Sequence, residues 1–383
     1  MLYMNVWYVA EFSENLADDP MLLKMLGRDF VLFRDRDGKA VCLSNVCPHR
    51  GASLAHGKCE DGGVTCSFHG WRFDGDGVCR RIPSQKNPER EIPSTAKVDS
   101  YPTDERQGLI WVFLGDQPEA GVPVFDIDEY TDPVWRHGKF ADVWASNAHW
   151  AKMTNLDHVH LPIVHGIDFG GENPIRPPEH EVKMLDRGFS TEIRGHKPPV
   201  SETGLAEYRS ERSPVVSKLA YFLPGMTLRG QVEIGGAGSG MFNLFYEFST
   251  PIDEETTQMR WLFFRNFAME PENDELHIKR NLRNVYQDKE LAEAMLPKRA
   301  PDQRGWPPIK IDREDRLMKA YWELLDGMRA RGWQIDRLRL EDCERDGDYR
   351  VIPSPGRRAD PNNWIFDAVP AITATNQPKL GVA

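Results

Sequence analysis

The sequence predicts an α+β fold in two parts, a small all-β domain at residues 1–117 and a larger domain at 118–383 built on an antiparallel sheet. Three observations support this prediction. Short β-rich runs and turns fill the first part, and a connector rich in proline and acidic residues follows at 117–133. Longer strand-like runs and then two helical segments fill the second part. A chain of 383 residues is long enough for two or three domains.

Local signals define the elements of the first part. The run FVLFRDRDGKAVCLSN has two β-rich arms that meet at Asp37-Gly38, a dipeptide typical of hairpin turns. GLIWVFLGD at 108–116 is typical of a buried strand that closes the domain.

The second part begins with helical lengths between Asn147 and His165 and continues with strands. The expected strands lie at 181–195, 227–236, 241–250 and 257–267. We expect two helices after them, one at 274–297 with Asn273 as its N-cap, and one from Asp312 to near Gly332.

Composition and charge narrow the classes of function. The formal net charge of −11 argues against a general affinity for nucleic acid or anionic lipid, because both require basic patches. The apolar runs are too short for a membrane span, and the N-terminus lacks the layout of a secretory signal. Five of the six cysteines lie within 38 positions, which favours a metal or redox site in a reducing cytoplasm over a disulfide scaffold.

Two short loops carry the most specific pattern, Cys47-Pro48-His49 and Cys66-Ser67-Phe68-His69. Zinc accepts two cysteines and two histidines, but zinc fingers pair cysteine with cysteine and histidine with histidine. Here each loop supplies one of each, which suits a [2Fe–2S] cluster with two thiolates on one iron and two imidazoles on the other. Gly51 and Gly70 follow the pairs and allow the backbone to approach the inorganic sulfides. Four unrelated buried residues and a zinc site remain the alternatives.

Through C47-P-H-R-G51 and C66-S-F-H-G-W71 the chain resembles the Rieske iron–sulfur family. The resemblance implies that Cys47, His49, Cys66 and His69 hold the cluster. Respiratory members of the family carry an extra disulfide-forming cysteine in each loop, and the corresponding residues here are Ala52 and Phe68. The chain is therefore similar to the oxygenase or ferredoxin type. We interpret the spare Cys42, Cys59 and Cys79 as small apolar core residues.

A second pattern, Asp157-x2-His160-x4-His165, lies in WAKMTNLDHVHLPIVHG at 150–166. Non-haem Fe(II) oxygenases use two histidines and one carboxylate and leave coordination positions open. On an ideal helix residues five apart point about 140° away from each other, so His160 and His165 can share a metal only if the helix is broken. Pro162 lies between them and is expected to break it. A solvated helix end rich in histidine is the alternative.

This pattern resembles the catalytic subunit of the Rieske non-haem iron oxygenases. The resemblance implies a helix-grip (START-like) catalytic domain, Fe(II) on His160 and His165, and a third ligand on a later helix, for which we select Asp288 over Glu290 and Glu293. It also implies that Asp157 bridges His69 of one subunit to His160 of the next in a homotrimer. His158 has no assigned role. Many relatives have Asn three residues before the bridging Asp; this chain has Thr154 there, after Met153, and Asn155 is shifted by one.

The resemblance implies an oxygenase component that uses O2 to hydroxylate or oxidatively demethylate an aromatic or polycyclic substrate. A cis-dihydroxylating dioxygenase, a Rieske electron-transfer protein and a zinc module are the alternatives. No flavin or NAD fingerprint occurs, so we expect electrons from a separate ferredoxin or flavin reductase. Five basic residues near the cluster loops are candidates for docking it: Arg50, Lys58, Arg72, Arg80 and Arg81.

Overall fold

The computed structural model divides the chain into two compact units. The first unit comprises 1–124, 250–253 and 327–383, and the second comprises 125–249 and 254–326. The structure describes residues 1–86, 91–167, 169, 174–176, 178–197, 208, 211, 213–234, 238–300 and 315–372.

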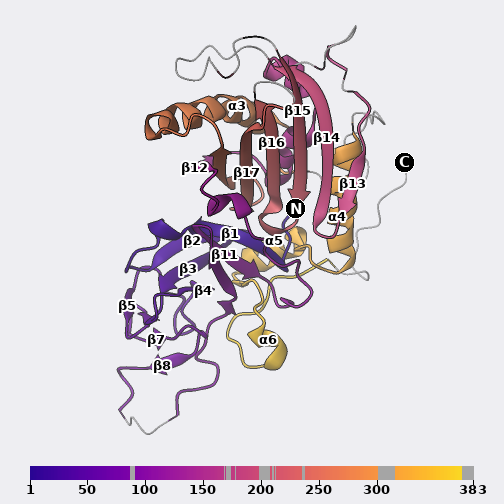
Figure 1. Ribbon diagram of the computed structural model, residues 1–383. Helices are drawn as coiled ribbons and strands as arrows, with labels where there is room; N and C mark the ends of the chain where they lie inside the picture. The colour runs from indigo at the N-terminus through magenta and orange to yellow at the C-terminus, as the bar shows by residue number, and fades with distance from the viewer. Residues whose placement is uncertain are drawn as a thin grey trace, which may run out of the picture. The chain divides into compact units, whose positions relative to one another are not determined.

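Three small antiparallel sheets form the first unit (Figure 1). The three-stranded sheet contains β1 (Val6–Phe12), β11 (Leu109–Leu114) and β10 (Thr103–Arg106). A four-stranded sheet contains β2 (Met21–Met25), β3 (Arg28–Arg34), β4 (Ala40–Ser44) and β9 (Ser100–Tyr101). Another contains β5 (Lys58–Glu60), β6 (Gly63–Thr65), β7 (Arg72–Phe73) and β8 (Cys79–Arg81). The β3–β4 hairpin across Asp37-Gly38 and the buried strand β11 confirm both predictions for this part.

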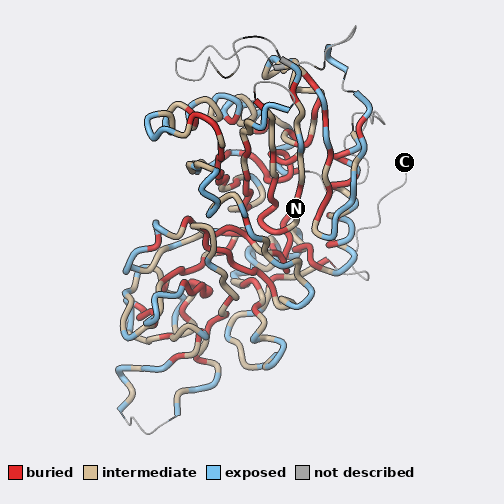
Figure 2. Tube along the Cα trace, viewed as in Figure 1, coloured by how far each residue is buried: buried red, intermediate tan, exposed pale blue. Residues whose placement is uncertain are grey.

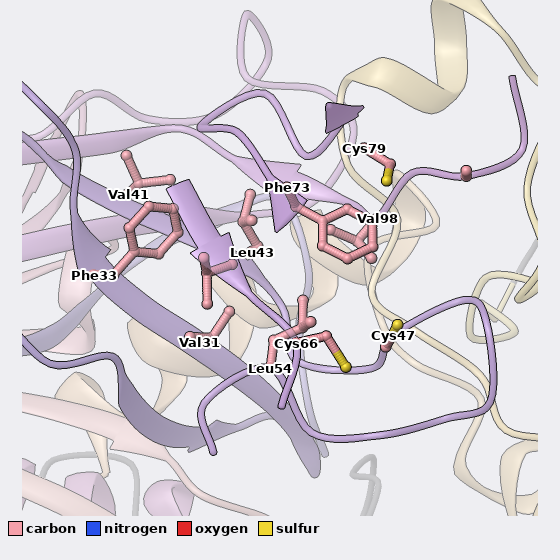
Figure 3. Packing of buried hydrophobic residues seen from close by; sticks show 12 residues of the cluster. Val31, Phe33, Val41, Leu43, Cys47, Leu54, Cys66, Phe73, Cys79 and Val98 are labelled. Carbon is pink, nitrogen blue, oxygen red and sulfur yellow. The ribbon is translucent and has the colours of Figure 1, made fainter. Parts of the chain in front are cut away.

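One apolar cluster of this unit joins residues of the last two sheets and includes the motif cysteines. Val31 and Leu43 from β3 and β4 pack with Phe73 from β7, and Cys47 and Cys66 belong to the same cluster (Figure 3). Both cysteines are 2% exposed. The loops that carry them therefore rest on a packed apolar base, which limits how far the thiols can move.

The C-terminal segment packs with the first unit, whereas the predicted division assigned all of 118–383 to the second domain. Asp99 is 2% exposed and accepts hydrogen bonds from Arg357 Nε at 2.7 Å and from Ser354 Oγ at 2.7 Å. Lys97 Nζ lies 4.3 Å from the centre of the Trp364 ring. The helices of this segment are α5 (Arg337–Arg345) and α6 (Gly356–Ala359). The predicted domain boundary after residue 117 remains a prediction. The contacts of Asp99 and Lys97 place residues 327–372 in the same compact unit as the cysteine loops.

The second unit contains one seven-stranded antiparallel sheet in the order β12-β18-β17-β16-β15-β14-β13 (Figure 1). Its strands are β12 (Arg136–Trp144), β13 (Val182–Leu185), β14 (Gly188–Lys197), β15 (Ser213–Phe222), β16 (Thr227–Ile234), β17 (Met241–Pro251) and β18 (Thr257–Arg265). They coincide with the four predicted strand segments and add β12 and β15. Figure 2 shows that the buried positions follow these strands.

Helix α3 (Asp274–Ala294) runs across the strands of this sheet (Figure 1). Trp144, Trp261 and Phe263 on the sheet pack against Val285 and Ala292 of α3. The other helices are α1 (Ala148–Leu156), α2 (His160–Val164) and α4 (Arg316–Ala330). Helix α3 starts where the sequence predicted and ends before the expected 297. The predicted cap Asp312 lies outside the described residues. An antiparallel sheet with a long helix across it confirms the predicted α+β class.

Candidate functional site

The two cysteine–histidine loops have the same local conformation. Gly51 donates its backbone N–H to the Cys47 carbonyl at 2.9 Å, and Gly70 does the same to Cys66 at 3.0 Å. Both glycines have positive φ, +72° and +69°, which a side chain would strain. Each loop therefore turns back tightly after its histidine, and this explains why glycine occurs at both positions.

The turns bring the four predicted cluster ligands together. The His49 and His69 rings are 4.4 Å apart between centroids, and the Trp71 ring stacks on His49 at 4.7 Å. The thiol sulfurs of Cys47 and Cys66 lie near each other in Figure 3. The cysteines are buried and His69 is exposed, so one pair of ligands faces the core and the other the surface.

Two observations indicate that a metal group fits between these loops, a buried ring nitrogen without a hydrogen-bond partner and a buried thiol. His49 Nδ1 is buried, and no hydrogen-bond partner for it exists among the described residues. Burial also raises the pKa of the Cys47 thiol to about 12, so the thiolate form is unfavourable at neutral pH unless a metal is bound. Two buried thiols beside two imidazoles therefore fit a [2Fe–2S] cluster of the mixed-ligand kind.

The spare cysteines behave as predicted. Cys42 and Cys79 are 0% and 3% exposed, and Cys59 is half-buried against the same core. Burial raises the pKa of Cys79 and Cys59, which disfavours their thiolates. They contribute packing rather than ligands.

The second unit brings His160, His165 and Asp288 together, with one ligand atom of each within 4.8 Å of the others. His165 Nε2 lies 2.9 Å from Asp288 Oδ1, and His160 Nε2 lies 3.5 Å from the same oxygen. His165 Nδ1 contacts Gln287 Oε1 at 2.9 Å. Because an amide oxygen only accepts, Nδ1 carries the proton and Nε2 is left as the ligand atom.

Two observations indicate that this cluster fits a divalent metal. Both ring nitrogens of His160 are buried without a hydrogen-bond partner in the described part of the chain, a costly arrangement that metal binding would relieve. Burial alone would raise the pKa of Asp288, but the neighbouring imidazoles of His160 and His165 lower it overall and favour the carboxylate. Two imidazoles and one carboxylate are the donor set of non-haem Fe(II) centres.

The break in the helix differs from the prediction. Helix α1 ends before Asp157, and α2 contains Pro162 in its first turn, where a proline N–H would be unpaired in any case. The expected break at Pro162 is therefore wrong. His160 begins α2 and His165 follows its last residue, and the two rings lie 5.1 Å apart between centroids.

Asp157 lies beside this centre, with Oδ2 3.8 Å from His160 Nδ1. Its other oxygen accepts the Val159 N–H at 2.7 Å, which fixes the carboxylate in the turn between α1 and α2. Burial raises its pKa. The predicted bridge to a second subunit stays a prediction.

Three neighbouring positions complete the segment. His158 is 9% exposed and packs edge-on against His180 at 5.4 Å, so it is a buried neighbour of the centre and not a surface residue. Thr154 donates to the Trp150 carbonyl within its own helix. Asn155 instead donates to Glu247 Oε2 at 2.7 Å and lines the adjacent cavity. The amide shifted by one residue therefore faces that cavity.

A cavity of about 170 Å³ adjoins the site formed by His160, His165 and Asp288. Its apolar lining includes Leu161, Ile167, Leu219, Leu228, Val232, Phe245, Trp261, Phe263 and Val285, and its polar lining includes Asn155, Gln231, Asn243, Glu247, Asn281 and Asn284. Sequence reasoning singled out Asn155 and missed the other polar residues. The spacing of Asn281 and Asp288, seven residues apart on one helix, was a signal that pointed to Asn281.

Comparisons with known proteins agree with both centres. Residues 6–102 match the Rieske [2Fe-2S] domain family, and residues 146–326 match the vanillate O-demethylase oxygenase C-terminal domain family. A 3-chlorobenzoate-3,4-dioxygenase oxygenase subunit from Comamonas testosteroni is 30% identical over 69% of this chain and 59% of its own length. The chain spans about half or less of the length of several other curated relatives.

Solved structures show the same fold. NdmA from Pseudomonas putida CBB5 with caffeine is 22% identical, with a TM-score of 0.69 over 85% of this chain and 91% of its own. Dicamba monooxygenase bound to 3,6-dichlorosalicylic acid is 25% identical, with a TM-score of 0.70 over 85% of this chain and 97% of its own.

A Rieske domain followed by an antiparallel-sheet oxygenase domain defines the class of this protein. The chain belongs to the Rieske non-haem iron oxygenases, whose cofactors are a [2Fe–2S] cluster and a mononuclear iron. Among the described helices, none has the length and hydropathy needed to cross a membrane.

Proposed function

We propose that this chain is the oxygenase component of a multicomponent enzyme that hydroxylates or oxidatively demethylates a small organic substrate, aromatic or polycyclic. The observation that carries the proposal is the convergence of His160, His165 and Asp288 at the wall of a cavity with a mostly apolar lining. A carrier that only passed electrons onward would need neither the second donor set nor the cavity.

Two sets of residues bind the two metal centres. Cys47, His49, Cys66 and His69 hold the cluster, and His160, His165 and Asp288 hold the iron. When bound, the cluster supplies electrons one at a time and the iron binds and activates dioxygen. Asp157, beside His160, links the mononuclear site to a neighbouring subunit's cluster. The apolar lining excludes water and holds the substrate carbon near the ligands.

The proposed reaction is balanced as follows. A substrate C–H bond, O2, two electrons and two protons give the alcohol and one water. Where the attacked carbon is an O-methyl or N-methyl group, the resulting hemiacetal or carbinolamine loses formaldehyde and leaves the demethylated product. One oxygen atom enters the organic product or the formaldehyde, and the other enters water.

Demethylation is favoured over dioxygenation by the family matched at 146–326, which is described by vanillate O-demethylation. Ring dihydroxylation is the second candidate, because a matching relative is a 3-chlorobenzoate-3,4-dioxygenase subunit. Labelling with ¹⁸O₂ separates them: demethylation places one labelled atom in the released formaldehyde and none in the demethylated product, whereas dihydroxylation places two in the organic product.

The electron donor is a separate ferredoxin or flavin reductase, and the assembly is a homotrimer in the cytoplasm; all three are part of the proposal. Of the five basic residues considered for docking, three form ion pairs with nearby acids: Lys58 with Glu60, Arg72 with Asp61, and Arg80 with Asp74. Arg50 and Arg81 are exposed and are the better candidates to contact an acidic donor.

Iron and acid-labile sulfide content of anaerobically purified protein tests the proposal. We expect about three irons and two sulfides per chain. A His160→Ala variant is expected to lose about one iron and all dioxygen uptake, with the visible spectrum of the cluster unchanged. Full activity in that variant would refute the oxygenase function, and zinc without sulfide would refute both centres.

A further inference from the structure

One face of α3 is polar where a helix that covers a sheet normally presents apolar side chains. Asn281 and Asp288 are seven residues apart, so they lie within about 20° of each other around the helix axis and about 10 Å apart along it. His277 lies one turn before Asn281 and is 2% exposed. Asp288 ends this polar stripe at the proposed iron, and the rest of the stripe has no part in metal binding.

A closed ring of hydrogen bonds fixes the other end of the stripe. His277 Nε2 lies 2.6 Å from Asn243 Oδ1, Asn243 Nδ2 donates to Asn281 Oδ1 at 2.9 Å, and Asn281 Nδ2 donates to the His277 carbonyl at 2.9 Å. Because the Asn243 oxygen accepts, His277 Nε2 carries its proton. Burial lowers the pKa of His277 to about 3, so it stays neutral and keeps this role.

The ring orients two amides toward the cavity. Asn243 and Asn281 line it, and after the ring is closed each NH2 group retains a second N–H and Asn281 Oδ1 retains a lone pair. These groups suit a neutral partner that accepts hydrogen bonds. His277 Nδ1 is itself buried with no partner among the described residues, so the histidine is held for its Nε2 proton at some energetic cost.

The charges around the cavity also disfavour an anionic substrate. Asp157, Glu247 and Asp288 line it, and among the described lining residues Lys218 is the only lysine or arginine. Lys218 is exposed, so water screens its charge. A substrate carboxylate at the Asn243–Asn281 end, about 10 Å along α3 from the proposed iron, would therefore leave water for a wall on which no described lining residue is a buried cation, which is unfavourable.

We propose that Asn243 and Asn281 bind a neutral hydrogen-bond acceptor of the substrate, a carbonyl or a ring nitrogen, with His277 as the residue that positions both amides. This inference rests on the oxygenase function proposed above and narrows its substrate class. The distance of about 10 Å along α3 from Asn281 to Asp288 matches a small ring system anchored at one end and presented to the iron at the other.

Two probes of equal shape test the charge preference, 4-methoxybenzamide and 4-methoxybenzoate, titrated by calorimetry into the full chain with both metal centres loaded. We expect the amide to bind about tenfold more tightly. Asn281→Leu and Asn243→Leu are each expected to weaken amide binding about tenfold and to reduce the preference toward unity, because each removes a hydrogen-bond partner from a buried acceptor. Glu290→Ala, on an exposed position of α3, is the matched control and should change nothing.

The role of His277 has its own variants. His277→Phe should reduce the amide preference as much as Asn281→Leu does, whereas His277→Gln, which can still donate from Nε2, should retain it. A structural role alone would lower thermal stability in His277→Phe without changing the ratio of the two affinities. That result would overturn the positioning role.

The inference would be overturned if the benzoate bound as tightly as the amide or more tightly, or if neither probe bound. Loss of benzoate binding in Lys218→Gln would also overturn it. Iron content and dioxygen uptake report separately on the oxygenase function. If these remain normal while the amide preference is missing, only the substrate class is wrong. If the amide preference is present but no reductant-dependent dioxygen uptake occurs, the binding site stands and the oxygenase function fails.

Discussion

The buried ion pair between Lys152 of α1 and Glu247 of β17 offers a sharp test of how the mononuclear site is held. Their side chains are 0% and 5% exposed. Glu247 Oε2 also accepts from Asn155 Nδ2 at 2.7 Å and from Trp261 Nε1 at 3.3 Å. Because α1 carries both Lys152 and Asn155 and leads directly to His160, this network fastens the metal-binding segment to the sheet.

Lys152→Met removes the cation and leaves a buried carboxylate. Breaking a buried pair in this way costs about 3–5 kcal/mol, and the two remaining donors to Glu247 place the expected loss near the lower end, about 3 kcal/mol. The double variant Lys152→Met/Glu247→Gln buries no charge, and its amide oxygen can still accept from Asn155 and Trp261. We therefore expect it to recover about 2 kcal/mol relative to the single variant.

Urea unfolding followed by far-UV circular dichroism measures these differences, with the visible absorbance of the cluster as an internal report on the first unit. The absorbance transition should stay unchanged, because the substitutions lie in the second unit. Lys289→Met, which breaks a half-exposed pair with Asp142, serves as the control and should cost at most about 1 kcal/mol. A loss below about 1 kcal/mol in Lys152→Met, or a double variant less stable than the single one, would refute the reasoning.

Three further outcomes are expected. Gln287→Leu removes the acceptor of His165 Nδ1–H and should weaken ferrous iron binding about 10–100-fold in a chelator competition, with the cluster spectrum intact. Hydrogen bonding to Arg136, with Arg265 adding to it, lowers the pKa of Asp274 to about 2 from its ordinary 3.8. The stabilisation from this carboxylate is therefore present above pH 4 and is lost as the pH falls toward 2. In acid unfolding, Asp274→Asn should remove this pH dependence, which is worth about 1 kcal/mol after screening. Gly70→Ala imposes a side chain at φ +69° and should destabilise the loop by about 1 kcal/mol, seen as earlier loss of cluster absorbance on heating.

The sequence was most informative where the chemistry is local. The loops around Cys47 and Cys66 could be identified because each ligand pair and its glycine occupy five consecutive residues, and the turn closes within the loop. The start of α3 and the Asp37-Gly38 hairpin were likewise predictable from short-range signals. The choice of Asp288 came from the resemblance, and the structure places it beside both histidines.

Long-range contacts could not be predicted in the same way. Glu247 is 95 residues from Lys152 along the chain, and nothing near either residue indicates the other. The pairing of Asp99 with Arg357, 258 residues apart, assigns the C-terminal segment to the first unit against the predicted division. The helix break was misplaced because Pro162 is a strong breaker inside a helix but is tolerated in a first turn, and sequence alone did not show where α2 begins.

The polarity of α3 connects stability with function. Helix α3 buries His277 and places Asn281 and Asp288 against a cavity. Its only fully buried apolar residues are Val285 and Ala292. The helix therefore has little of the apolar burial that usually attaches a helix to a sheet. Ion pairs and a hydrogen-bonded ring provide attachment instead, Asp274 with Arg136 and Arg265 at one end and Asn243 in the middle. Such contacts are directional, so they fix the rotation of the helix about its axis more sharply than apolar packing would. A metal ligand and two substrate-facing amides on one stripe require that rotation to be fixed, which is a physical reason for a polar face at this position.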